Sequence, residues 1–114
     1  MKVIDKITIS ELKELSMKMV EDIVKADVDI EKNIVIIDAP YHADMETYLI
    51  EEGSNSEDIW GINFHPHKYG TEDFVEFDSM INLKPRLGNR SRYVEDENVR
   101  KKILELVEKV IVDA

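Results

Sequence analysis

Hydrophobic and polar positions alternate along this chain with two different periods, which predicts helices and strands in a definite order. Residues 7–24, ITISELKELSMKMVEDIV, carry apolar side chains at helical spacing. Thr8 and Glu11 have the three-residue separation of a capping box, which places the start of the helix there. The apolar stripe of this first predicted helix consists of Leu12, Leu15, Met19 and Ile23.

The next apolar segments predict a hairpin followed by a short helix. Residues 25–30, KADVDI, alternate between apolar and polar, and residues 34–38, IVIID, form a nearly continuous apolar run. We expect these two strands to pair across the turn EKN, with the second strand at the centre of a sheet. Residues 42–52 return to helical spacing, and Gly53 is a suitable stop for that helix.

A second hairpin is predicted from residues 59–66, IWGINFHP, and residues 74–84, FVEFDSMINLK. Both alternate with the period of a strand, and the loop between them is short enough for antiparallel pairing. That pairing would place Asn63 opposite Glu76 and Gly61 opposite Asp78. A last helix, capped by Asp96, would bury a stripe made of Val99, Ile103, Leu106 and Val110.

These elements predict an α+β fold in the order α-β-β-α-β-β-α. We expect a mostly antiparallel four-stranded sheet with helices packed on one side. The sequence has no internal repeat and no linker rich in proline, glycine or serine, so residues 1–114 are expected to form a single domain.

Composition narrows the classes of function. The formal net charge is −10, which makes nucleic acid an unlikely partner because phosphate binding needs a broad basic face. There is no cysteine, no signal-peptide pattern and no apolar run long enough for a membrane span, so we expect a cytoplasmic protein without membrane contact.

One loop is basic in this acidic chain. Residues 79–94 contain no acidic side chain, and the loop offers Lys84, Arg86, Asn89, Arg90, Ser91 and Arg92 as candidate ligand-binding residues. Arginine forks bind phosphate or carboxylate in two places, so the loop predicts an anion site. The alternative is structural, with the same arginines paired to acidic groups of the predicted helix at 42–52 or to Glu95 and Glu97.

Candidate catalytic residues fall in two places. His42 and Asp44 lie at the predicted start of a helix with Glu46 nearby, and a histidine beside carboxylates can act as a general base. The alternative is that these acids only complement the helix dipole. Glu76 and Asp78 would share the polar face of the second hairpin, where two carboxylates could serve acid–base chemistry or simply be solvated.

The three histidines of the chain are weak candidates for a metal site. His42, His65 and His67 could contribute imidazole ligands if their segments meet in space. The spacing is not that of a recognised zinc motif, so no metal is assigned. The sequence specifies neither a reaction nor a cofactor.

Four segments, HADMETYLIEEGS, DIWGINFHP, EFDSMINLKP and GNRSR, occur in this order and span most of the chain. With them the sequence resembles a small family of uncharacterised bacterial and archaeal proteins, a domain of unknown function. The resemblance implies a compact single domain and brings no activity or catalytic residue with it.

Two hypotheses of function remain from the sequence. In the first, the basic loop binds an anionic small molecule, and His42, Asp44 or the hairpin carboxylates exchange protons with it. In the second, the protein is an interaction module or homo-oligomer that buries the stripe of the last helix or a sheet edge against another chain.

Overall fold

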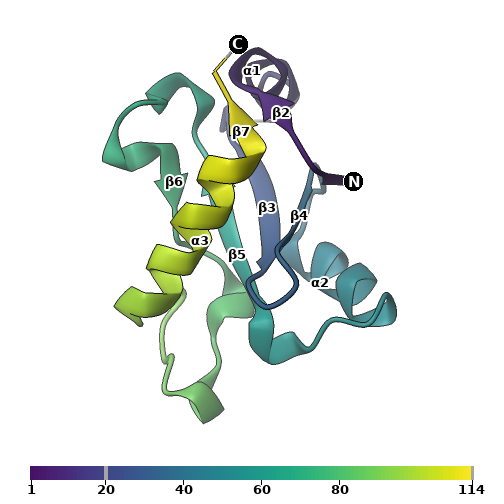
Figure 1. The fold of residues 1–114 in the computed structure, drawn as a ribbon, viewed down its shortest axis with the longest axis vertical. Coiled ribbons are helices and arrows are strands. Elements are labelled where there is room, and N and C mark those ends of the chain that lie inside the picture. The colour runs from purple at the N-terminus through teal and green to yellow at the C-terminus, as the bar shows by residue number, and fades with distance from the viewer. Residues whose placement is uncertain (20, 114) are drawn as a thin grey trace.

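The computed structural model describes residues 1–19 and 21–113, and the chain folds as an α+β structure (Figure 1). Its elements in chain order are β1 (Lys2–Ile4), β2 (Ile7–Thr8), α1 (Ile9–Ser16), β3 (Val24–Asp29), β4 (Ile34–Ile37), α2 (His42–Glu51), β5 (Ile59–Phe64), β6 (Val75–Glu76), α3 (Glu97–Val110) and β7 (Ile111–Val112). Short 3₁₀ turns occupy much of the chain between β5 and α3.

The main sheet has five strands in the order β1-β4-β3-β5-β6, and every neighbouring pair is antiparallel. The hairpin of β3 and β4 forms as predicted, with Val28 opposite Val35, and β4 lies between β1 and β3. Full burial of Val35, Ile36 and Ile37 explains why this strand reads as a continuous apolar run.

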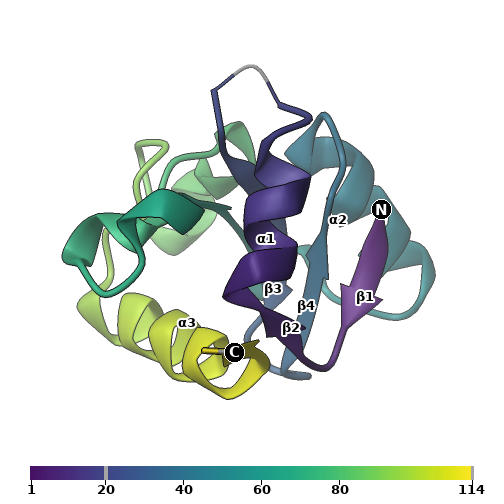
Figure 2. The same cartoon turned by 90° about the horizontal axis from the view of Figure 1, so that it is seen from above.

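Helices cover both faces of this sheet, so the prediction of helices on one side is wrong. The larger core joins α1 and α3 to one face, in a cluster that contains Leu12 and Ile103 from the helices and Ile62 from β5. The smaller core joins Met45 and Leu49 of α2 to Ile36, which points to the opposite face. Figure 2 shows the strands between α3, at the bottom of the view, and α2, at the upper right.

Three strands were missed, so the predicted element order is wrong in detail. β1 pairs with β4 at one edge of the main sheet, while β2 and β7 form a separate two-stranded parallel sheet in which Ile7 lies opposite Ile111. These strands have two or three residues each, too few to show a period in the sequence.

The first helix is shorter than predicted. Its capping box is present, with the Thr8 hydroxyl accepting from the Glu11 amide and the Glu11 carboxylate accepting from the Thr8 amide. The helix ends at Ser16, whose hydroxyl donates to the Lys13 carbonyl, and Ile23 is buried from the segment after it. Residue 20, inside the predicted helix, lies outside the described residues.

The second half of the second hairpin is mostly not a strand. Asn63 does lie opposite Glu76, as predicted, but β6 ends there and a 3₁₀ turn follows at Met80–Asn82. The predicted position of Gly61 opposite Asp78 is therefore not part of the ladder.

The last helix matches its prediction closely. Asp96 caps α3 by accepting from the Asn98 amide, and Ile103, Leu106 and Val110 are buried in the core of the same chain. That stripe is therefore not free to bind another chain. None of the helices described in residues 1–19 and 21–113 has the length and apolar character needed to cross a bilayer.

Candidate functional site

A polar cleft opens beside the start of α2, on the face of the sheet that α2 covers. We call it the His42 cleft. Its volume is about 230 Å³, and it is lined by Glu21, Ile23, Lys25, His42, Asn63, His65, Glu76, Asp78 and Arg92. The chain thus brings together side chains from β3, α2, β5, β6 and the basic loop.

The floor of the cleft is a buried histidine–aspartate pair. His42 Nδ1 lies 2.7 Å from Oδ1 of Asp27, a β3 residue with no exposed surface. The other Asp27 oxygen, Oδ2, is buried without a hydrogen-bond partner among the described residues. Burial raises the pKa of Asp27 to about 6, although the hydrogen bond and positive charge of His42 oppose that rise.

Asn63 fixes how His42 is protonated at its other nitrogen. The Asn63 amide nitrogen lies 3.0 Å from the Asp78 carbonyl oxygen and 3.0 Å from Glu76 Oε1, and both oxygens accept hydrogen bonds. Asn63 Oδ1 therefore faces His42 Nε2, at 2.9 Å, and accepts a hydrogen bond from the Nε2–H group. With Nε2 protonated, Nδ1 is the nitrogen that faces Asp27 Oδ1, so the hydrogen bond between them forms when a proton is held between the imidazole and the carboxyl group.

The mouth of the cleft carries the more accessible groups. His65 Nε2 lies 3.2 Å from Glu76 Oε1, and about half of the Glu76 side chain is exposed. Partial burial acts to raise the pKa of Glu76, but hydrogen bonds from Asn63 and His65 outweigh it and hold that pKa below its ordinary value. The cleft thus has one carboxyl group that burial pushes toward its protonated form and another held ionised.

Arg92 closes one side of the cleft through Asp78. Its Nε lies 2.7 Å from Asp78 Oδ1 and its Nη2 lies 3.1 Å from Asp78 Oδ2, a two-point ion pair with both side chains roughly half exposed. This contact fixes the plane of the guanidinium and uses only part of its donors, because an arginine has five N–H groups.

Gly61 allows this arrangement because it has no side chain. A Cβ at this position would lie 2.5 Å from the Ser79 Cβ and 3.0 Å from His42 Nδ1. Ser79 and His42 therefore both approach the β5 backbone at the place where a Cβ would lie, at distances that only glycine permits.

The side chain of Asn82 makes the hydrogen bonds to Gly61 that a neighbouring strand would otherwise make. Its Oδ1 accepts from the Gly61 amide at 2.8 Å, and its Nδ2 donates to the Gly61 carbonyl at 3.0 Å and to the Arg92 carbonyl at 2.9 Å. The side chain thus satisfies the edge of β5 and attaches the basic loop to it.

The interior of the basic loop is held by its own side chains. Buried Asn89 donates to the carbonyls of Asn82 and Tyr93 and accepts from the Glu95 amide. The Glu95 carboxylate accepts from the Ser91 hydroxyl and the Arg90 amide. Asn89 and Ser91, predicted to contact a ligand, are therefore engaged in shaping the loop.

The cations of the loop point to different places. Arg92 lines the His42 cleft, whereas Lys84 and Arg86 line a separate cavity of about 500 Å³ beside Glu46 and Glu57. The Arg90 side chain is exposed and lines neither of these cavities.

Lys84 is the most enclosed of these cations. Its Nζ donates to the Ser56 carbonyl at 2.8 Å, lies 5.2 Å from the centre of the Trp60 ring, and is 4.0 Å from Glu46. Burial lowers the pKa of Lys84, although the negative charges of Glu46 and Asp27 oppose the change.

Besides the residues of the basic loop just described, Asp44 and His67 also lie away from the cleft. Asp44 is exposed in the first turn of α2 and lines a different hollow, with Asp38. His67 is exposed in the turn after β5, while His42 and His65 share the cleft. Across residues 1–19 and 21–113, no group of three or more histidine, cysteine or acidic side chains is arranged to hold a metal ion.

Sequence reasoning missed Asp27, which falls among the polar positions of the strand predicted at residues 25–30. The burial of Asp27 could have been predicted from the apolar stripe of the helix at 42–51, because that stripe must pack against a face of the sheet. Asp27 and Asp29 alternate with buried Ala26 and Val28 in β3, so covering the second face buries the two aspartates as well. Asp29 accepts from the amides of residues 31 and 32 and from Ser54, so its burial is explained by local hydrogen bonds.

Fold and cleft together define an α+β protein with a buried histidine–aspartate pair beneath a polar cleft. Over residues 1–110 the chain matches the family described as "Protein of unknown function (DUF5674)", and it belongs to that family. The resemblance seen in the four sequence segments is thus confirmed. No curated protein and no solved structure matches the chain.

Proposed function

We propose that the protein binds a small anionic molecule in the His42 cleft, with a phosphate or carboxylate group held by Arg92. The observation that carries this proposal is the His42–Asp27 pair, with its unpartnered Asp27 oxygen, buried directly below a cleft that contains an oriented arginine. A buried ionisable pair costs stability compared with apolar packing, and such pairs with perturbed pKa values are concentrated at functional sites.

The anion contact would use the donors of Arg92 that Asp78 leaves free. Asp78 fixes the guanidinium plane, and the ammonium of Lys25, which makes no ion pair within residues 1–19 and 21–113, lines the same cleft. The guanidinium of Arg92 and the ammonium of Lys25 beside a small volume favour a phosphate or carboxylate group.

The acidic side chains of the cleft select the rest of the ligand. Glu76 and Asp78 line the same space and would accept hydrogen bonds from hydroxyl or amino groups next to the anionic group. The ligand class is therefore a small hydroxy or amino acid, or a phosphorylated equivalent. A volume of about 230 Å³ is below the usual range for drug-sized ligands, which agrees with a small molecule.

Proton exchange would occur at the mouth of the cleft. The His65–Glu76 pair is accessible, and Asn63 joins Glu76 to His42 below it. In this arrangement His65 or Glu76 would exchange a proton with the ligand, and Asp27 with His42 would fix the position of Asn63.

The test is a titration of the protein with malate, aspartate and inorganic phosphate, followed by calorimetry and by amide chemical shifts. We expect at least one of these probes to bind and to shift the amides around Asn63 and His65. Arg92→Ala should abolish binding. Arg90→Ala is the matched control, because it removes one cation from the same loop outside the cleft.

Equal loss of binding in Arg90→Ala and Arg92→Ala would contradict the proposal, since general attraction to the loop would then explain the data. Absence of binding by all three probes would contradict the ligand class. Circular dichroism of both variants checks that the fold persists, which is expected because the Arg92–Asp78 pair is half exposed and contributes less than about 1 kcal/mol.

A specific observation favours the second candidate function, a purely structural loop in an interaction module. Asn89, Glu95 and Ser91 bind one another inside the loop, as a structural element requires. In that case neither arginine variant changes any ligand response. An exposed sheet edge would then provide the contact with a second copy or another protein, which sedimentation of the wild type would detect.

A further inference from the structure

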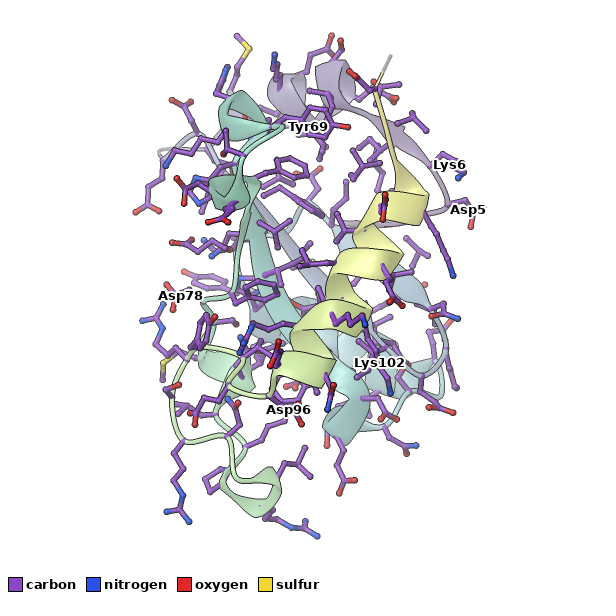
Figure 3. The ribbon with its side chains drawn as sticks, turned by 60° about the vertical axis from the view of Figure 1, so that its left-hand side comes forward. Asp5, Lys6, Tyr69, Asp78, Asp96 and Lys102 are labelled. Carbon is purple, nitrogen blue, oxygen red and sulfur yellow. The ribbon has the colours of Figure 1, made fainter. Side chains whose placement is uncertain are left out.

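A second cavity lies beside the turn at the start of the basic loop, and we call it the Lys84 cavity. Its volume is about 500 Å³. Half of the residues that line it are apolar, namely Met80, Ile81, Leu83, Pro85 and Leu87. Among the described residues, none lines both this cavity and the His42 cleft. Figure 3 shows Asp78 of the His42 cleft well above the light green turn Pro85–Leu87 at the lower end of the molecule, so the two sites are separate.

The charged side chains of the Lys84 cavity balance one another. Lys84 and Arg86 line it together with Glu46 and Glu57. The formal charges of these four side chains cancel, so net charge does not select the ligand. A neutral molecule with an apolar chain suits this lining.

The side-chain nitrogen of Lys84 lies at the wall of this cavity. Its Nζ donates to the Ser56 carbonyl at 2.8 Å and lies 4.0 Å from Glu46 Oε2, and both of these neighbours line the cavity. The Lys84 side chain is 10% exposed, so it is enclosed without being closed to solvent. The nitrogen is therefore held in one place and can be reached through the cavity.

The surroundings of Lys84 favour its neutral amine more than water does. Burial lowers the pKa of Lys84. The charged groups that face it oppose this shift without cancelling it, and they are Glu46 of α2, Asp27 of β3, and Glu57 with Asp58 in the turn before β5. A neutral lysine amine is a nucleophile toward carbonyl carbon, and desolvated lysines form Schiff bases in proteins.

We propose that Lys84 forms a Schiff base with a small aldehyde that carries an apolar chain and binds in the Lys84 cavity. The apolar chain packs against the side chains of Leu83 and Leu87, and the carboxylate of Glu46 moves the protons of the reaction. This activity is independent of the ligand proposed for the His42 cleft.

The reaction conserves every atom and electron pair. The lone pair of the neutral Nζ attacks the carbonyl carbon, and the π pair of the C=O bond moves to the oxygen. Glu46 transfers one proton from the nitrogen to that oxygen, which gives a neutral carbinolamine. Glu46 then transfers the second nitrogen proton to the hydroxyl group, the C–O bond pair leaves with water, and the electrons released at the nitrogen form the C=N bond. The products are one imine and one water, so neither an oxidant nor a reductant is consumed.

Pentanal with cyanoborohydride tests the proposal, because the reductant traps each imine as a stable secondary amine. Peptide mass spectrometry then measures the rate of labelling at each lysine. Lys32 is the matched comparison within the same protein, since its Nζ also donates to a backbone carbonyl, that of Gly53, but its side chain is exposed. We expect labelling of Lys84 to be about tenfold or more faster than that of Lys32 at pH 7. Equal or slower labelling of Lys84 would overturn the proposal.

Acetaldehyde tests the role of the cavity, because it has the same reacting group without the apolar chain. The ratio of Lys84 labelling to Lys32 labelling should fall about tenfold or more from pentanal to acetaldehyde, since the contacts of three methylene groups are lost. An equal ratio for the two aldehydes would show that the cavity does not bind the chain, and the assigned class of ligand would then be wrong.

The variant Glu46→Gln distinguishes proton transfer from a structural contact. At high pH, where the amine is already neutral, labelling of Lys84 should slow about tenfold or more because the base is lost. The midpoint of the pH profile should move to lower pH, because the negative charge of Glu46 favours the ammonium form of Lys84. Glu51→Gln removes an exposed carboxylate from the same helix and should leave both values nearly unchanged. An unchanged high-pH rate in Glu46→Gln, or equal changes in the two variants, would overturn the role given to Glu46.

Discussion

The two faces of the five-stranded sheet are both buried, but they achieve this burial by different means. Under α1 and α3 the side chains of the strands are apolar and pack against helix residues such as Leu12 and Ile103. Under α2 the apolar cluster is small, and Asp27, Asn63 and Asn82 are buried beside it in hydrogen bonds. The first face stabilises the fold through the apolar surface area that it buries. The second face fixes where its side chains lie, because each buried polar group there has few acceptable hydrogen-bond partners.

The difference suggests where selection for function acts. An apolar face tolerates exchanges among side chains of similar volume. A buried polar group without its partner costs about 1–3 kcal/mol, so the α2 face would be costly to maintain if it only filled space. The effects of substitutions on the two faces should therefore differ in kind as well as in size.

The largest effect is expected on the apolar face. Ile103→Ala should lower the free energy of unfolding by about 3–4 kcal/mol, because it removes a fully buried side chain and leaves a cavity. Urea unfolding at neutral pH measures this loss. Leu104→Ala, at the neighbouring position with 45% exposure, is the control and should cost less than about 1 kcal/mol. Similar losses in the two variants would contradict the packing of α3 on the sheet.

The second effect, on the polar face, depends on pH. The pKa of Asp27 is raised from 3.8 to about 6, so between these values the folded state binds more protons than the unfolded state. The contribution of Asp27 to stability is therefore greatest below pH 4 and is lost as pH rises through 6. Relative to Asp27→Asn, the wild type should lose up to about 3 kcal/mol between pH 4 and pH 7.

Urea unfolding of both proteins across this range measures the difference. Asp44→Asn removes an exposed carboxylate from the helix that carries His42, and its stability should follow that of the wild type. A constant difference between wild type and Asp27→Asn from pH 4 to pH 7 would show that the carboxyl group does not titrate in this range.

The smallest of the three effects is expected at Asn82, whose side chain makes the hydrogen bonds to Gly61 that a neighbouring strand would otherwise make. Asn82→Ala leaves the Gly61 amide and carbonyl without their partner and should cost about 2 kcal/mol. Hydrogen exchange at the Gly61 amide should accelerate strongly. Asn55→Ala is the control, since Asn55 is exposed and its side chain makes no capping hydrogen bond. An unchanged exchange rate at Gly61 would show that Asn82 does not protect it.

Much of the fold could be predicted from the sequence, because the relevant patterns are local. The capping box at Thr8 and the cap at Asp96 each depend on contacts within three residues, and both form. The alternation in residues 25–30 and 59–64 correctly assigned one face of each strand to the core. The error concerned the other face, since a pattern that alternates apolar and polar cannot show that polar residues are also covered.

The candidate site could be predicted only in part for the same reason. His42, Glu76, Asp78 and Arg92 were proposed from their chemistry, and they meet in one cleft. Asp27 was not proposed, because its burial depends on α2 packing across the sheet. The basic loop looked like one site in sequence, but Pro85 to Leu87 form a turn that sends Lys84 and Arg92 to different cavities.

The small β2–β7 sheet has a consequence for the order in which the chain can fold. Ile7 pairs with Ile111, and the Lys6 ammonium donates to the Lys109 carbonyl across a separation of 103 positions. Closing so long a loop is entropically costly and is repaid only when the intervening core exists. During synthesis the edge of β2 must therefore remain unpaired until nearly all of the described chain has left the ribosome.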